Sequence, residues 1–173
     1  MKSIARRTFL QGAAGIVVAF SLPCGAQAAP ATLDGDSVDA YLAIAPDGGV
    51  TVYAGKVDLG TGARAAIRQI VAEELGMRPE RIDMVEGDTA LTPNQGGTGG
   101  SSGIMAGGMQ IRQAAATARQ GLINLAAVQL KQPAESLETA DGAVVPRTGG
   151  TGISFGTLVK GAGSLLPSTR TPG

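Results

Sequence analysis

The sequence predicts an α+β domain in which a small mixed or antiparallel sheet carries two main helices on one face. Short apolar stretches separated by turn residues indicate strands, and two longer segments carry apolar residues at helical spacing. These elements follow one another as two strands, a helix, a strand, a glycine-rich segment, a long helix, two strands and a short helix. Beyond an N-terminal leader the chain keeps about 145 residues, which is enough for one small domain.

The domain is expected to open with a β-hairpin. From Val38 the chain reads VDAYLAIAPDGGVTVYAGKVDLG, two apolar stretches joined by the turn sequence PDGG at 46–49. Such turns favour residues that accept a positive φ, which glycine does readily. Two antiparallel strands are therefore predicted on either side of this turn.

A helix is predicted from about Gly62 to Leu75, because apolar residues recur at helical spacing and Gly76 can end the helix. RIDMVEGD then alternates as a short strand that ends at Gly87. After the glycine-rich segment a second helix is expected from about Gly107 or Met109. Its broad apolar face comprises Ile111, Ala114, Ala115, Ala118, Leu122, Leu125, Ala126 and Leu130.

The C-terminal part predicts a second hairpin. Strands around 136–139 and 143–145 are joined by Asp141-Gly142, a favoured pair for a tight turn. SFGTLVKGAG predicts one or two helical turns. The predicted domain thus covers 38–161, after a linker at 29–37 and before a loose tail at 162–173.

The first 28 residues have the layout of an export signal, with a basic start, an apolar middle and a small-residue end. Arg6 and Arg7 before Thr8-Phe9-Leu10 give a twin-arginine pattern, and the sequence AQA at 26–28 predicts cleavage before Ala29. A single membrane anchor is the alternative. The apolar run at 12–22 is shorter than the roughly 20 residues that a spanning helix needs, so we expect an exported, periplasmic chain without a stable membrane span.

Composition excludes several kinds of chemistry in the mature chain. The chain has no histidine, and its one cysteine, Cys24, lies in the leader. Zinc, haem and iron–sulfur sites, and Cys or His nucleophiles, therefore lack their usual side chains. The mature chain would hold eleven basic and fourteen acidic residues with no tryptophan, so no nucleic-acid partner is expected.

The first glycine motif, KVDLGTGARAA, lies between a strand and a helix. Gly60, Gly62 and Ala65 fit the pattern G-x-G-x-x-A, and Asp83 lies about 20 residues further on, as a dinucleotide-binding unit requires. However, a hairpin precedes the motif, whereas that unit begins with the first strand of a parallel pair. Alternatively, the glycines only end a strand and start a helix.

The second glycine motif is the segment Thr92–Gly108, TPNQGGTGGSSGIMAGG, in which seven of seventeen residues are glycine. Because a helix follows, free backbone N–H groups and the hydroxyls of Thr98, Ser101 and Ser102 can cradle phosphate oxygens. A flexible linker is the alternative. No G-x-x-x-x-G-K-[ST] pattern occurs, which argues against a nucleoside triphosphate site.

Together these motifs resemble a known family. The stretch from GKVDLGTGARAA through EGDTALTPNQGGTGGSSG to MQIRQAAATAR is similar to the N-terminal portion of the molybdopterin-binding large subunits of the xanthine dehydrogenase and aldehyde oxidase superfamily. Within this superfamily, the stretch resembles the exported branch of the isoquinoline 1-oxidoreductase beta subunits. The similarity runs from about Val38 to Gly161.

The resemblance implies a hydroxylase whose molybdenum is held by molybdopterin, in the dinucleotide form of that cofactor, and which passes electrons to an iron–sulfur subunit. It assigns the cofactor-binding positions to Gly60, Thr61, Gly62, Gly96, Gly97, Thr98, Gly99, Gly100, Ser101 and Ser102. No metal ligand or catalytic residue is assigned. Thr61 stands where the family commonly has glutamine, and the family's catalytic glutamate belongs to a C-terminal part that has no counterpart in this sequence.

We therefore expect a fragment or split subunit of an exported molybdenum hydroxylase that is inactive alone. It would bind cofactor only together with the remainder of the subunit. The alternative is a non-catalytic exported binding or scaffold domain, or a truncated remnant of such a subunit.

Overall fold

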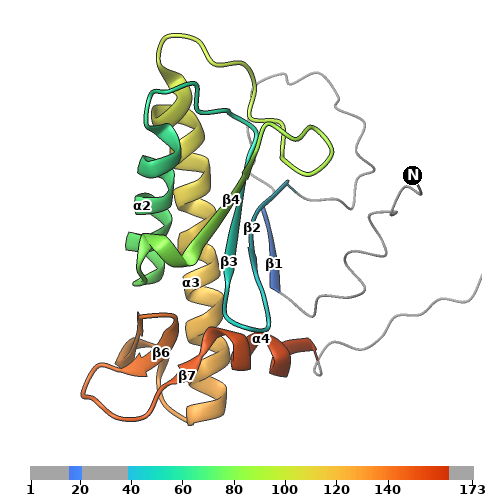
Figure 1. Ribbon diagram of the computed structural model, residues 1–173. Helices are drawn as coiled ribbons and strands as arrows, with labels where there is room; N and C mark the ends of the chain where they lie inside the picture. The colour runs from blue at the N-terminus through green and yellow to red at the C-terminus, as the bar shows by residue number, and fades with distance from the viewer. Residues whose placement is uncertain (1–15, 21–38, 164–173) are drawn as a thin grey trace, which may run out of the picture.

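The computed structural model describes residues 16–20 and 39–163 and has the predicted α+β architecture (Figure 1). A four-stranded sheet has the order β1-β2-β3-β4, and a smaller sheet has the order β5-β6-β7. Helices α2 and α3 lie side by side on one face of the larger sheet. Most of the predicted leader, the linker at 29–37 and the tail from residue 164 lie outside the described residues.

The predicted first hairpin is present. Strands β2 (Asp39–Ile44) and β3 (Val50–Ala54) pair antiparallel. Their turn is closed by Gly48 N–H donating to Ala45 O at 2.8 Å, and Gly48 has a φ of 87°. Strand β1 (Ile16–Phe20) pairs antiparallel with the other edge of β2. It lies within the predicted leader, so β2 would become the edge strand of a chain without that leader.

Strand β4 (Ile82–Glu86) pairs with β3 in parallel, from Val50 opposite Ile82 to Ala54 opposite Glu86. Helix α2 (Ala63–Leu75) and the short helix η1 (Pro79–Arg81) form the crossover between these strands. The second strand of the hairpin is therefore also the first strand of a parallel βαβ unit, so the presence of a hairpin does not exclude such a unit. Asp83 nevertheless lies near the start of β4, opposite Thr51, and so at the other end of the strand from the glycine turn.

The second long helix begins at the predicted place. Helix α3 (Met109–Leu130) is preceded by the π-helical turn η2 (Gly103–Gly108). The predicted face is buried except for Leu125 and Leu130, which are half-buried, and Ile123 joins it. Among the described helices, none is both long enough and apolar enough to cross a membrane.

The C-terminal hairpin forms a sheet of its own. The turn η3 (Ala134–Ser136) leads into β5 (Leu137–Ala140), which pairs antiparallel with β6 (Ala143–Pro146). β7 (Ile153–Ser154), which was not predicted, adds to β6, and helix α4 (Phe155–Gly163) follows. The 22 residues of α3 span about 33 Å. The hairpin lies near the C-terminal end of this helix, far from the glycine-rich segment at its start (Figure 1).

The core fills the space between the larger sheet and the two helices, and continues down α3 to α4. Leu42, Val52, Leu75 and Ile111 are fully buried in it, as is Phe155 in the lower part. Helix α4 packs closely on the first hairpin: a Cβ at Gly156 would lie 2.3 Å from Pro46 O. The two halves are thus joined by backbone contact as well as by side chains.

Candidate functional site

Two connecting segments meet at one end of the molecule. The glycine turn, residues 55–62, links β3 to α2, and the glycine segment, Thr92–Gly108, follows β4 and leads into α3. Since β3 and β4 are parallel neighbours, their carboxyl ends lie at the same edge of the sheet (Figure 1). This edge is where open α/β sheets usually bind ligands.

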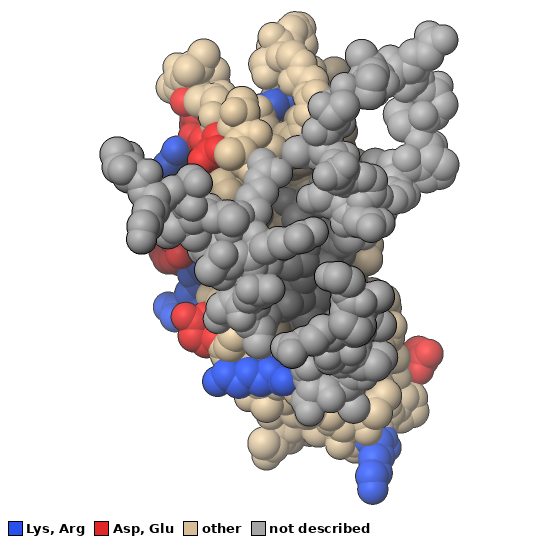
Figure 2. All heavy atoms as spheres, turned by 90° about the vertical axis from the view of Figure 1, so that its right-hand side faces the viewer, with Lys and Arg blue, Asp and Glu red and all other residues tan. Residues whose placement is uncertain are grey.

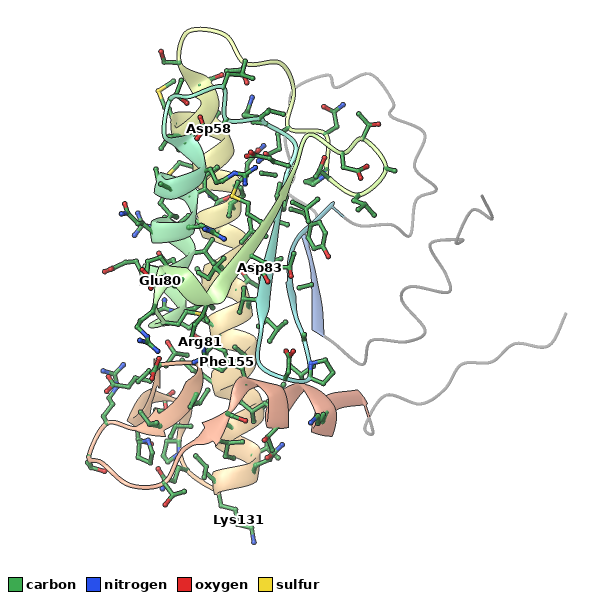
Figure 3. All side chains as sticks on the ribbon, in the orientation of Figure 1. Asp58, Glu80, Arg81, Asp83, Lys131 and Phe155 are labelled. Atoms are coloured by element: carbon green, nitrogen blue, oxygen red, sulfur yellow. The ribbon has the colours of Figure 1, made fainter. Side chains whose placement is uncertain are left out.

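The glycine turn is organised by Asp58, which lies at this end in Figure 3. Its Oδ1 accepts hydrogen bonds from the N–H groups of Gly60 (2.9 Å), Thr61 (2.8 Å) and Gly62 (3.2 Å). Its Oδ2 accepts from Arg64 N–H (3.1 Å), at the start of α2. The Arg64 amide, with those of Thr61 and Gly60 and the Thr61 hydroxyl, holds the pKa of Asp58 below its ordinary value.

This arrangement limits what the turn can offer a ligand. The amides of Gly60, Thr61 and Gly62 are already engaged by Asp58, and the Thr61 hydroxyl also donates to Asp58 Oδ1 (3.1 Å). Gly60 and Gly62 have φ values of 93° and 79°, which explains glycine at both positions. The turn therefore presents a fixed backbone surface rather than a set of free donors.

An ion pair ties the start of α2 to the end of β4. Arg64 donates from Nε to Glu86 Oε1 at 2.9 Å, and its terminal nitrogen contacts the same oxygen. The Glu86 side chain is largely buried, whereas Arg64 is half-exposed. This glutamate is therefore held in place by a cation and is not a free base.

The glycine segment is fixed from behind by two side chains. Lys56 Nζ donates to Gly97 O (2.9 Å) and Gly96 O (3.3 Å). Gln95 accepts at Oε1 from Gly55 N–H (2.9 Å) and donates from Nε2 to Gly107 O (3.1 Å). The Gln95 Nε2 also donates to Gln110 Oε1 (3.0 Å) in α3. The segment is therefore attached to the end of β3 and to α3, and closed on its own π-helical turn η2, which is not the behaviour of a flexible linker.

Three glycines of this segment have no reason for their identity within the described structure. At Gly97, Gly99 and Gly103 an added Cβ would meet no atom within 4 Å, and none of them has a positive φ. Gly96 and Gly100 do have positive φ values, of 72° and 57°, and so does Ser101, at 60°. A glycine that has room for a Cβ and no positive φ is expected where a group outside the described residues approaches the backbone closely.

The hydroxyls of the segment are unequally available. Ser102 Oγ accepts from Gly99 N–H at 3.4 Å, and Ser102 N–H donates to Gly99 O at 3.2 Å. Within 39–163, neither the Thr98 nor the Ser101 side chain has a hydrogen-bonding partner, and both residues are exposed. These two hydroxyls can bind an approaching polar group.

Exposed apolar side chains surround the two glycine regions. Most of the exposed large apolar residues belong to the segments at this end, namely Val57, Leu59, Leu91, Ile104, Met105 and Met109. A groove of about 600 Å³ between α2 and η2 is lined by Ile70, Met105, Met109 and Arg112, among others. The candidate site thus has an apolar rim of the kind that a covering chain or a flat ligand would bury.

A larger groove, of about 1040 Å³, lies at the opposite end of α2, between Gly76 and Asp141. Asp141 pairs there with Arg81 (3.6 Å) and Arg78 (3.9 Å) at the surface. Because exposed pairs such as these carry little energy and no chemistry, we place the candidate site at the glycine end despite the smaller groove. In Figure 2 most of the visible basic and acidic side chains lie next to one another along the left side of the face.

All ten residues that the sequence singled out lie in these two segments at one end of the molecule. Sequence reasoning missed Asp58, Lys56 and Gln95. Asp58 could have been found as an aspartate whose side chain accepts hydrogen bonds from the backbone of the turn after it, but nothing in the local pattern marks Lys56 or Gln95 as buried. No cluster of three or more acidic side chains able to hold a metal occurs in the part of the chain that the structure describes.

Comparisons with known proteins identify the family of the chain. A family model described as a molybdopterin cofactor-binding domain matches residues 4–170. A nicotinate dehydrogenase subunit of Pseudomonas putida is 44% identical over 126 residues, which are 73% of this chain and 10% of that protein. A probable xanthine dehydrogenase subunit of Bacillus subtilis is 41% identical over 68 residues, which are 39% of this chain and 9% of that protein.

The fold is shared with solved structures. Quinoline 2-oxidoreductase from Pseudomonas putida 86 superposes with a TM-score of 0.61 and 25% identity, over 75% of this chain and 17% of that one. The chain thus spans less than a fifth of the length of the relatives it matches. It belongs to the molybdopterin cofactor-binding domain family, among oxidoreductase subunits related to xanthine dehydrogenase.

Proposed function

We propose that this chain supplies part of the molybdopterin cradle of an exported molybdenum hydroxylase and is inactive without the rest of the subunit. The open glycines Gly97, Gly99 and Gly103 carry this proposal, because the described structure gives no other reason for them. The relatives span far more polypeptide than this chain does, which supports the need for a remainder.

The residues present fit the cofactor. Molybdopterin holds its metal through its own sulfur atoms, so the scarcity of protein ligands in the described part of the chain is compatible with it. Gly96–Ser102 would lie along its phosphate end, where free amides and the hydroxyls of Thr98 and Ser101 can donate, and the Asp58-braced turn at Gly60–Gly62 would pack near its metal end. When bound, the cofactor supplies the two-electron chemistry that hydroxylates a substrate with oxygen from water.

The substrate class is proposed from the relatives. Nicotinate and quinoline, which the names of two relatives contain, are N-heterocycles, and we extend an N-heterocycle or aldehyde substrate to the complete enzyme. An iron–sulfur subunit would accept the electrons, and the cofactor would be used in its dinucleotide form. Thr61 reaches less far than a glutamine and already donates to Asp58, so we expect no contact from its side chain to a metal-bound group.

The test is the molybdenum content of the chain purified from its own host, with co-purifying polypeptides identified by mass spectrometry. We expect molybdenum together with a larger polypeptide and an iron–sulfur protein. Gly99→Val should lower the molybdenum content by filling the open side of the glycine segment. Gly121→Val is the matched control. A Cβ added at Gly121 also meets no atom within 4 Å, but this glycine lies on α3, outside the segment.

Absence of both metal and partner in the native host would contradict the proposal. It would favour the second candidate, a non-catalytic exported binding or scaffold domain, or a truncated remnant that keeps the fold. Hydroxylation of an N-heterocycle by the purified chain alone would instead overturn the claim that the chain is incomplete.

Export through the twin-arginine pathway is a separate proposal, supported by Arg6 and Arg7 and by the small residues at 26–28. Replacing both arginines with lysine should keep the chain in the cytoplasmic fraction with its leader uncleaved. Unchanged cleavage before Ala29 in that double variant would contradict this route.

A further inference from the structure

The two buried polar residues of the described core both lie against Gly107, at the end of the glycine segment. Lys56 is 7% exposed and Gln95 is 9% exposed, and no other polar or charged residue in that part of the chain is as deeply buried. Buried polar groups destabilise a fold unless their hydrogen bonds are made, so a satisfied pair of this kind favours one conformation of what it contacts. Lys56 contacts the segment that the proposed function uses, and Gln95 belongs to that segment.

Lys56 is a buried cation that forms no ion pair with the described residues. Its ammonium donates to the carbonyl oxygens of Gly97 (2.9 Å) and Gly96 (3.3 Å), and no carboxylate in the described residues forms an ion pair with it. Buried charges in proteins are normally compensated by a counter-charge. In the described residues, the groups that bind this ammonium directly are the two carbonyls.

The direction of these two carbonyls fixes the direction of two amides. In a planar trans peptide unit the C=O of one residue and the N–H of the next point in opposite directions. Because the carbonyls of Gly96 and Gly97 point to Lys56, the N–H groups of Gly97 and Thr98 point away from it. Both residues are exposed, and within residues 39–163 neither amide has a hydrogen-bonding partner.

Lys56, Gln95 and Gly107 together form a clamp on the glycine segment, and its other two members keep Lys56 in this position. Gly107 lies against its stem, since an added Cβ there would be 2.8 Å from Lys56 Cδ. Gln95 holds the base of the segment to Gly55 on one side and to Gly107 on the other. The lysine therefore has little freedom to turn away from the two carbonyls.

We propose that Lys56 is a positioning residue that turns the Gly97 and Thr98 amides outward and adds the positive charge that makes them select an anionic, phosphate-bearing group. This inference rests on the proposed function, in which that group is the phosphate end of the cofactor. It identifies which amides of the segment hold the phosphate and which side chain prepares them.

The experiment uses the full chain labelled with ¹⁵N and inorganic pyrophosphate as the probe, without molybdenum. We expect saturable shifts of the Gly97 and Thr98 amide signals that weaken as salt is added, because salt screens the charge. The amides of Gly60 and Gly62, which Asp58 already engages, should move much less. Pyrophosphate that shifts other amides and leaves Gly97 and Thr98 unmoved would overturn the proposal.

Variants separate charge from shape. Lys56→Met should weaken pyrophosphate binding by about tenfold and increase hydrogen exchange at 96–100, since it removes charge-assisted hydrogen bonds. Lys56→Arg shares the stem to Cδ and should restore both readings. Lys131→Met is the matched control, because Lys131 is exposed and lies at the far end of the molecule (Figure 3).

Binding in folded Lys56→Met within twofold of wild type would overturn the proposal, as would loss of binding in folded Lys56→Arg. Circular dichroism checks the fold of each variant. Should Lys56→Met not fold, the wild-type shift map and Lys56→Arg decide the question. Since no reading depends on molybdenum, failure of the proposed function would show in the metal analysis, whereas failure of this inference would show here.

Discussion

Glycines at the two ends of the molecule serve different purposes. At the lower end, around the second hairpin and α4, an added Cβ would collide with backbone, as at Gly156 (2.3 Å from Pro46 O) and Gly152 (2.5 Å from Val144 O). At the upper end, Gly97 and Gly99 have open space and no positive φ. Packing within the fold explains why Gly156 and Gly152 are glycines. It does not explain Gly97 and Gly99, for which we look to a ligand or a covering chain.

The difference shows that glycine content by itself does not indicate a binding site. What distinguishes the two ends is the environment of each Cβ position, together with the buried Lys56 and Gln95 at the upper end alone. The lower end should therefore respond to substitution through stability, and the upper end mainly through binding.

The largest difference between the two ends is expected when a large apolar side chain is truncated to alanine at each end and the free energy of unfolding is measured. Phe155 is fully buried, so Phe155→Ala should lower the free energy of unfolding by about 3–5 kcal/mol. Met105 is 71% exposed, so Met105→Ala should change it by less than about 0.5 kcal/mol. Urea unfolding followed by circular dichroism measures both. Equal losses would mean that Met105 is covered in solution, for instance by a second copy of the chain.

The same substitution, glycine to alanine, can be compared at the two ends. Gly156→Ala should lower the free energy of unfolding by about 2–3 kcal/mol, because backbone must move to admit the Cβ. Gly99→Ala should change it by less than about 0.5 kcal/mol. The same urea titration tests both variants. A destabilised Gly99→Ala would show that the segment is packed against something in the free chain.

Gln95 combines the properties of the two ends, because it is buried like the core residues of the lower end but belongs to the candidate site at the upper end. Gln95→Leu leaves the Gly55 N–H and the Gly107 carbonyl without their partner and should lower the free energy of unfolding by about 2 kcal/mol. Hydrogen exchange should rise at 93–103 more than in β5 and β6. Uniform exchange across the molecule would mean that the clamp supports the whole fold rather than the segment.

The smallest effect concerns pH. The Arg64 amide and its neighbours lower the pKa of Asp58 below its ordinary value of about 3.9. The carboxylate therefore stabilises the glycine turn above that ordinary pKa, and this contribution is lost as pH falls through the lowered value. The Asp58 carboxyl and the amides of Gly60 and Thr61, followed by NMR from about pH 6 downward, should titrate together. Asp58→Asn should abolish this titration at both amides, and an Asp58 pKa at or above about 3.9 would contradict the assigned hydrogen bonds.

Much of the fold could be predicted from the sequence, because it depends on local patterns. The PDGG turn, the helix that Gly76 ends, and the Asp141-Gly142 hairpin all occur where propensity and periodicity placed them. The parallel pairing of β3 with β4 was not predicted, and neither was β7. Strand pairing depends on where the intervening helix packs, and a two-residue strand carries almost no periodic signal.

The site was predictable as two segments but not as a set of contacts. Glycine spacing located residues 60–62 and 96–102, whereas the clamp joins residues forty positions apart, as in Gln95 to Gly55. A lysine after a strand ordinarily predicts an exposed side chain. Its burial follows from the tertiary approach of Gly107, which the sequence around Lys56 does not reveal.

The parallel crossover between β3 and β4 also bears on the order in which the molecule assembles. The two hairpins close over turns of a few residues and can form early, since short loops close quickly. The Lys56 and Gln95 contacts span about forty residues, so a much longer loop must close before they form. We therefore expect the amides of Gly97 and Thr98 to be among the last groups to reach their native positions. The scaffold would then fold before the anion-binding site that it carries is complete.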